Sequence, residues 1–110
     1  THLLRSNCKI THQPDWGSLY IYMKGKKLPS PESFLQYIVS LRNENHFHEE
    51  ICEMVFKRVI DIFAPQKLMV ACMYTRRGGI DINPVRVLPE TALPTALTNP
   101  NLMSRASFRQ

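Results

Sequence analysis

The stretch FHEEICEMVFKRVIDIFAPQKLMVACMYT, residues 47–75, decides the fold because its hydrophobic period changes partway along. In its first part apolar side chains recur every three or four residues, which predicts an amphipathic helix that ends near Phe63, before Pro65. From Lys67 to Thr75 a short apolar run, Leu68 to Tyr74, predicts a strand. The stripe of the helix is Phe47, Ile51, Val55, Val59 and Ile62, and the buried face of the strand is Leu68, Val70, Cys72 and Tyr74.

The flanking segments predict two strands and one more helix before this unit, and one strand after it. Ser30-Pro31-Glu32 is typical of a helix start, with Ser as N-cap, Pro at the first helical position and an acid in the first turn. The polar residues 42–45 end that helix, and Gly78-Gly79 supplies a tight turn before the last strand. The predicted strands in these flanks are 3–11, 16–24 and 80–87.

The element order is therefore ββααββ, which predicts an α+β fold in which two helices pack on one face of a four-stranded antiparallel sheet. We assign residues 1–88 to this module. Residues 89–110, which contain Pro89, Pro94 and Pro100, are expected to form an extended C-terminal tail.

Composition narrows the class of protein. The 110 residues are 44% hydrophobic and 21% charged, as in ordinary globular domains, and no apolar run reaches the length of a membrane span. Three cysteines without close spacing argue against a disulfide framework or a zinc knuckle and favour a reducing compartment such as the cytoplasm.

The net charge of +5 indicates an anionic partner, which leaves nucleic acid, a membrane surface and a phosphorylated small molecule open. A small basic RNA-binding module is one alternative, supported by the cluster Lys24, Lys26 and Lys27. The chain lacks the aromatic-rich strand motif that RNA-stacking sheets use, which weighs against direct nucleic-acid binding.

Cys8 is a candidate nucleophile because Arg5 and Lys9 flank it and favour a thiolate. Asp15 follows just past a turn at residues 12–15, close enough in sequence to return to the end of the strand as a proton donor. The alternative is an unreactive cysteine on an edge strand beside an ordinary turn aspartate. Cys52 and Cys72 are interpreted as packing residues.

Two further clusters carry possible chemistry. Because Phe47 and Ile51 are expected to face the core, His48 and Glu49 are expected to project toward one edge of the sheet, although an acid at a helix start is favourable by itself. The spacing is not HExxH, so a zincin site is excluded. The second cluster either binds a phosphate group or forms a basic hairpin turn. It consists of Arg76, Arg77, Gly78 and Gly79.

Four motifs together resemble the NADPH-dependent 7-cyano-7-deazaguanine reductases, the nitrile reductases of queuosine biosynthesis, a step of tRNA modification. Their order, spacing and identity agree with that family from residue 6 to residue 84. The family has the tunnelling fold (T-fold), a ββααββ module that assembles sheet to sheet. The motifs are Ser6-Asn7-Cys8, His12-Gln13-Pro14-Asp15-Trp16-Gly17, Phe47-His48-Glu49 and Arg76-Arg77-Gly78-Gly79-Ile80-Asp81-Ile82-Asn83-Pro84.

The resemblance implies three catalytic residues and no metal. Cys8 would attack the nitrile carbon of 7-cyano-7-deazaguanine to give a covalent thioimide, and Asp15 would protonate the nitrogen, for which its pKa must be raised. His48 would assist proton transfer. Two NADPH would then reduce the adduct, by way of an imine, to the primary amine 7-aminomethyl-7-deazaguanine.

The resemblance also implies binding roles. Glu49 would accept hydrogen bonds from the pyrimidine edge of the substrate, and Phe47 would pack near its base. Arg76 and Arg77, with the glycines Gly78 and Gly79, would approach the phosphates of NADPH.

One departure from the family points to a partner. The Glu-Ser-x-Lys type motif that binds NADPH has lost its lysines here and reads Glu32-Ser33-Phe34-Leu35-Gln36-Tyr37. Together with the start at Thr1 without Met, this predicts the C-terminal half of a two-module reductase, whose partner is an N-terminal T-fold module of the same protein. Sheet-to-sheet assembly further predicts a homo-oligomer.

A rival on the same fold is a zinc-dependent cyclohydrolase of the GTP/pterin type. It would use Cys8, His12 and His48 as metal ligands. The setting of Asp15 and the Arg76–Gly79 stretch fit the reductase better.

Overall fold

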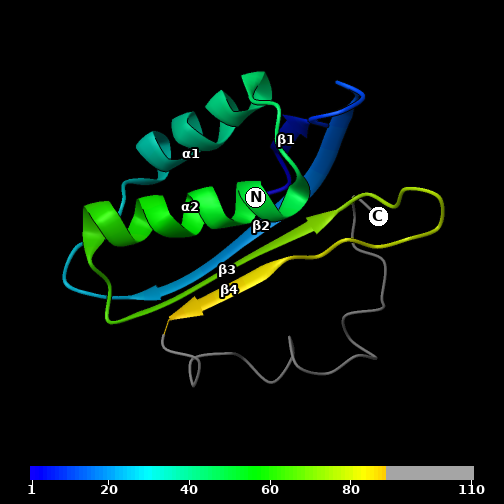
Figure 1. Ribbon diagram of the computed structural model, residues 1–110. Helices are drawn as coiled ribbons and strands as arrows, with labels where there is room; N and C mark the ends of the chain where they lie inside the picture. The colour runs from blue at the N-terminus through cyan, green and yellow to red at the C-terminus, as the bar shows by residue number, and fades with distance from the viewer. Residues whose placement is uncertain (89–110) are drawn as a thin grey trace.

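Two helices cover one face of a four-stranded antiparallel sheet in the computed structural model (Figure 1). The structure describes residues 1–88, so the predicted tail, residues 89–110, lies outside the described residues. A single 3₁₀ turn, η1, lies between the helices. The elements are β1 (Leu4–Asn7), β2 (Pro14–Lys24), α1 (Pro31–Ser40), η1 (Leu41–Asn43), α2 (His48–Phe63), β3 (Lys67–Tyr74) and β4 (Val85–Leu88).

The strands lie in the order β1-β2-β3-β4, so each strand pairs with its sequence neighbour among the strands. This confirms the predicted α+β class and the ββααββ order. The longest pairing joins β2 to β3, where Leu19 lies opposite Cys72 and Ile21 opposite Val70. Alternate residues of the two strands therefore share one face, as the period of two predicted.

The core lies between that face and the helices. Ile51, Val55 and Val59 of α2 are buried in one cluster with side chains of the sheet. All four predicted strand residues, Leu68, Val70, Cys72 and Tyr74, are fully buried, and so is Cys52. Each large apolar side chain moved out of water contributes roughly 1.5–3 kcal/mol, so this layer is a main source of stability.

The helix ends follow local chemistry. Ser30 caps α1 as predicted, because its Oγ accepts a hydrogen bond from the Ser33 N–H at 3.2 Å. Ala64 ends α2 with a left-handed φ of 43°, directly before Pro65. Neither helix within residues 1–88 combines the length and the apolar character that a bilayer span requires.

The start of α2 differs from the prediction. Phe47 is the N-cap residue and is 41% exposed, whereas His48 is buried, so the expectation that Phe47 faces the core is wrong. The cause is local: Phe47 precedes the first helical turn, and the ring of His48 packs on that of Tyr74 with centroids 4.1 Å apart. Ile62, at the other end of the stripe, is also largely exposed.

The first strand is shorter than predicted. β1 ends at Asn7 instead of residue 11, because residues 8–13, here called the Cys8 loop, close on themselves. The Cys8 N–H donates to the Gln13 carbonyl at 2.8 Å, and the His12 N–H donates to the Cys8 carbonyl at 2.9 Å. His12 adopts a φ of 58°, which an extended strand does not allow.

The last strand starts later than predicted, at Val85 instead of residue 80. Gly78 and Gly79 have φ values of 59° and 79° and form a two-residue turn, in which Arg77 and Ile80 exchange backbone hydrogen bonds of 3.1 and 3.0 Å. Residues 81–84 then run without strand pairing up to Pro84, which has no N–H for a ladder. The turn is as predicted, but the strand is displaced from it.

No helix of residues 1–88 covers the second face of the sheet (Figure 1). The register places Tyr20 beside Ala71 and Tyr22 beside Met69 on that face. Both tyrosines are large and substantially exposed, at 40% and 49%. Tyr20 and Tyr22 therefore give this face exposed aromatic surface, although Met69 and Ala71 beside them are buried.

Candidate functional site

The Cys8 loop surrounds a thiol with hydrogen-bond donors. The pKa of Cys8 falls from 9.0 to about 6, chiefly because the Thr11 hydroxyl donates to the sulfur and because the backbone N–H groups of Thr11 and Ile10 also point at it. The Arg77 side chain adds a further donor. Cys8 is 9% exposed, so these fixed donors take the place of solvent around a thiolate.

This geometry makes a prediction about thiol reactivity. Only the thiolate is nucleophilic, so alkylation of Cys8 by iodoacetamide should rise through a midpoint near pH 6 and level off at neutral pH. The Thr11→Val variant should move the midpoint upward, because it loses the hydroxyl that contributes most to the lowered pKa. The measurement is the rate of mass gain against pH. A wild-type midpoint near 8.5, the value of a free cysteine, would contradict the site.

Asp15 is the second residue of the long strand β2 and is nearly fully buried, at 4% exposure. The two oxygens of its carboxyl group face different partners. Oδ2 lies 3.2 Å from Nε2 of His48, and Oδ1 lies 3.2 Å from Nε of Arg77. Because Arg77 contacts both Cys8 and Asp15, the thiol and the carboxyl group belong to one cluster.

His48 is in the first turn of α2, and its buried side chain lies beside Asp15. Its Nε2 is buried and makes no well-aligned hydrogen bond within the part of the chain described, although Asp15 Oδ2 is close enough for an ion pair. The ring of His48 packs on that of Tyr74. Burial raises the pKa of the Tyr74 phenol far above its ordinary value, so the phenol is neutral.

The two arginines point to different places. Arg77 reaches the Cys8 cluster and also donates from Nη2 to Gln13 Oε1 at 3.4 Å. Arg76 is about half exposed, and its Nε donates to Asp81 Oδ1 at 2.7 Å. The turn that follows is open, since a Cβ added at Gly78 or Gly79 would meet nothing within 4 Å.

Glu49 and Phe47 flank the buried His48 at the exposed start of α2. Among residues 1–88 Glu49 has no hydrogen-bond or ion-pair partner, and it borders an open hollow of about 540 Å³ beside Lys9 and Glu50. The predicted orientation of Glu49 toward an edge agrees with this exposure. A free carboxylate at a helix start can accept hydrogen bonds from a ligand.

Sequence reasoning missed two residues of the site, Thr11 and Gln13, and one contact of Arg77, which the resemblance placed at the cofactor phosphates. Thr11 lowers the pKa of the thiol, Gln13 contacts Arg77, and Arg77 itself contacts Asp15. The spacing Cys8-x-x-Thr11, just before a Pro-Asp turn, is the one signal in the sequence that indicates a tight loop around the sulfur. The long reach of Arg77 from the β3–β4 connection has no local signal.

Two structural facts bear on alternatives. In the described range no three His, Cys, Asp or Glu side chains gather in an arrangement that could hold a metal ion, and this includes Cys8, His12 and His48. A larger groove of about 760 Å³ lies between β2 and α1 and is lined mainly by apolar residues such as Leu28, Phe34 and Leu35. None of the Cys8 cluster lines it, so it is separate from the candidate site.

Comparison with known proteins identifies the family and relatives of this chain. Residues 14–92 match the family model described as QueF-like protein. The chain is 53% identical over 94 residues to the NADPH-dependent 7-cyano-7-deazaguanine reductases of Acinetobacter baumannii strains SDF and AYE. The matched region is 86% of this chain and 34% of each relative, so the chain spans about a third of their length.

A solved structure supports the fold. The crystal structure of the archaeosine synthase QueF-Like in the apo form superposes with a TM-score of 0.70 at 20% identity, over 76% of this chain and 84% of that one. The family match covers most of the chain, and the element order agrees with the T-fold expectation. The chain belongs to the QueF-like protein family.

Proposed function

We propose that this chain is the catalytic module of an NADPH-dependent nitrile reductase that converts 7-cyano-7-deazaguanine to 7-aminomethyl-7-deazaguanine in queuosine biosynthesis. The observation that carries the proposal is a thiol of lowered pKa that shares Arg77 with a buried Asp15–His48 pair. Proteins 53% identical to this chain bear the name of that reductase.

The first step uses only residues of this chain. The Cys8 thiolate attacks the nitrile carbon, a C–S bond forms, and one C–N π-bond electron pair moves to nitrogen. That nitrogen takes the proton held between Asp15 Oδ2 and His48 Nε2, which gives a neutral thioimide. Arg77 keeps the charge of the Asp15 carboxylate balanced once the proton has left.

Covalent attachment suits a nitrile, which is a weak electrophile toward direct hydride delivery. A sulfur nucleophile divides the difficult reduction into easier steps and leaves readily afterwards. We assign Glu49 to the pyrimidine edge of the substrate because its carboxylate has no partner among residues 1–88, and Phe47 to the face of the base because its ring is exposed.

The residues present fit the phosphates of a dinucleotide. Arg76 is exposed, and the Gly78-Gly79 turn leaves open space beside its backbone, so we assign the cofactor contact to these three residues. Arg77 is assigned to the Cys8 cluster, since it contacts the buried Asp15, whereas Arg76 pairs with the partly exposed Asp81. NADPH, when bound, supplies the hydride.

We propose that residues 1–88 work with an N-terminal T-fold module of the same protein and form a homo-oligomer. The length comparison supports this, because the relatives are about three times longer than the matched region. The uncovered sheet face with Tyr20 and Tyr22 offers an apolar surface for such a module. The three free thiols suit a reducing compartment, for which we propose the cytoplasm.

The test is intact mass after incubation of the folded, reduced chain with 7-cyano-7-deazaguanine and no cofactor. A one-to-one adduct is expected. We further expect little or no NADPH oxidation by the chain alone, because the cofactor motif with lysines is missing from residues 32–37. A folded sample without adduct would overturn the nucleophile role, and fast NADPH turnover by the isolated chain would overturn the need for a partner module.

A further inference from the structure

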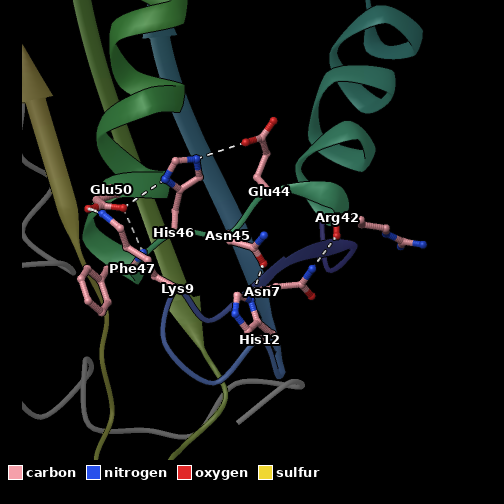
Figure 2. A network of polar contacts seen from close by, with 9 residues as sticks. All are labelled: Asn7, Lys9, His12, Arg42, Glu44, Asn45, His46, Phe47 and Glu50. Atoms are coloured by element: carbon pink, nitrogen blue, oxygen red, sulfur yellow. Dashed lines mark hydrogen bonds and ion pairs between the residues drawn. The ribbon is translucent and has the colours of Figure 1, made fainter.

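The proposed site is divided between two elements that are far apart in sequence. The nucleophile lies in the Cys8 loop, and the group assigned to the substrate base lies in the first turn of α2. The residue after Cys8 is Lys9, and the residue after Glu49 is Glu50. Lys9 Nζ lies 3.2 Å from Glu50 Oε1, so one ion pair joins the two halves of the site across 41 positions of sequence (Figure 2).

Glu50 is held in one orientation because both of its carboxylate oxygens are occupied. Oε2 accepts the Phe47 N–H at 3.2 Å, which caps the first turn of α2, and it lies 3.1 Å from Nδ1 of His46. The same contacts lower the pKa of Glu50, with the Phe47 N–H the largest cause. The remaining oxygen is then directed at Lys9, whose ammonium also lies 5.5 Å from the centre of the Phe47 ring.

The segment before α2 is itself fixed to the end of β1. The Asn7 N–H donates to the Glu44 carbonyl at 2.9 Å, and the His46 N–H donates to the Asn7 carbonyl at 3.0 Å. The Asn7 side chain donates to the Arg42 carbonyl at 3.2 Å, and Nε2 of His46 lies 3.2 Å from Glu44 Oε2 (Figure 2). The backbone at residue 7 is therefore anchored, and on the far side of Cys8 the loop is linked by Lys9–Glu50 and by the contact of His12 Nδ1 with Asn45 Oδ1 at 3.4 Å.

We propose that Glu50, through Lys9, is a positioning residue that sets the separation between the Cys8 sulfur and the Glu49 carboxylate. This role rests on the proposed function. Lys9 is not among the groups that lower the pKa of Cys8, so its effect acts through geometry and not through thiolate formation. The pair is half exposed, and such pairs add little to stability, so its loss leaves the fold intact.

The experiment is a double-variant cycle on the full chain with Glu50→Gln, Lys9→Gln and both together. Glutamine keeps an oxygen for the Phe47 N–H but removes the charge that holds Lys9. The half-saturating concentration of 7-cyano-7-deazaguanine for adduct formation should rise roughly two- to fivefold in each single variant, the range that a half-exposed ion pair can supply. The double variant should be no worse than either, and Lys9→Arg should retain most of the wild-type behaviour.

Three measurements separate positioning from other roles. The pH midpoint of Cys8 alkylation and the melting temperature should stay at their wild-type values in all of these variants. Arg86→Gln is the matched control, since it removes a similar exposed ion pair with Glu53 of α2, 3.1 Å long, that does not touch the Cys8 loop. That control should bind substrate like the wild type.

Each contrary outcome has a distinct meaning. Additive losses in the double variant, a shifted alkylation midpoint, or an effect explained by a lowered melting temperature would overturn the positioning role. Wild-type saturation in the single variants would also overturn it while leaving the nucleophile role standing. A wild-type chain that forms no adduct would overturn the proposed function and, with it, this role.

Discussion

The Cys8→Ala variant should form no adduct with 7-cyano-7-deazaguanine, while the wild type gains one substrate mass. The thiolate is the only strong nucleophile in the cluster, because Asp15 is occupied by His48 and Arg77 and the Tyr74 phenol is buried and neutral. Alanine removes the sulfur and little packing volume, so the variant should keep the circular dichroism spectrum of the wild type. The loss should therefore be complete without unfolding.

Peptide mapping supplies the internal control for this prediction. Trypsin releases the three cysteines on separate fragments, namely residues 6–9 with Cys8, residues 43–57 with Cys52 and residues 68–76 with Cys72. The adduct should be confined to the first fragment, since the other two thiols are fully buried. Modification of either buried cysteine, or an adduct that persists in Cys8→Ala, would contradict the assignment.

The Asp15→Asn variant should slow adduct formation by roughly two to four orders of magnitude, the usual contribution of a positioned proton donor. Asparagine has the shape of aspartate but cannot share an acidic proton with His48 Nε2, and it leaves the guanidinium of Arg77 without its ion pair. The measurement is the single-turnover rate of mass gain at neutral pH. The alkylation of Cys8 by iodoacetamide, which needs no proton donor, should persist.

Asp61→Asn is the control for this change. Asp61 lies on the exposed surface of α2, far along the helix from its first turn, and the substitution removes the same charge. It should form the adduct at the wild-type rate. Equal rates for the wild type and Asp15→Asn would remove Asp15 from the proton path and leave His48 as the donor.

The sequence predicted the parts of the fold that depend on local pattern. Ser30 and Pro31 mark the start of α1 by capping chemistry alone, and the apolar run from Leu68 to Tyr74 identifies β3 as a buried strand. The predicted end of β1 and the predicted start of β4 were wrong, because turns determine where those strands stop and begin. The left-handed φ of His12 and the backbone bonds of the Cys8 loop depend on the closing contact with Gln13, which no periodicity reveals.

The residues of the candidate site divide in the same way, into those that the local sequence indicates and those that only tertiary contacts reveal. Cys8 and Asp15 stood out by residue type and by the turn between them, and the resemblance to a family supplied His48 and Glu49. The burial of His48 on Tyr74 and the contact of Arg77 with Asp15 are tertiary, since each joins residues more than 25 positions apart. Side-chain identity could suggest phosphate for both arginines, but only the packing distinguished Arg76 from Arg77.

The connection between β3 and β4 carries a consequence for how this protein tolerates changes in length. Surface connections usually accept inserted residues, because nothing depends on their exact span. Here Arg77 must reach from one side of the Gly78-Gly79 turn to the carboxyl group of Asp15, while Pro84 on the other side accepts the Cys72 N–H at 3.0 Å. Residues 75–84 are therefore fixed at both ends, and we expect a single inserted residue to separate Arg77 from Asp15 while the sheet still forms.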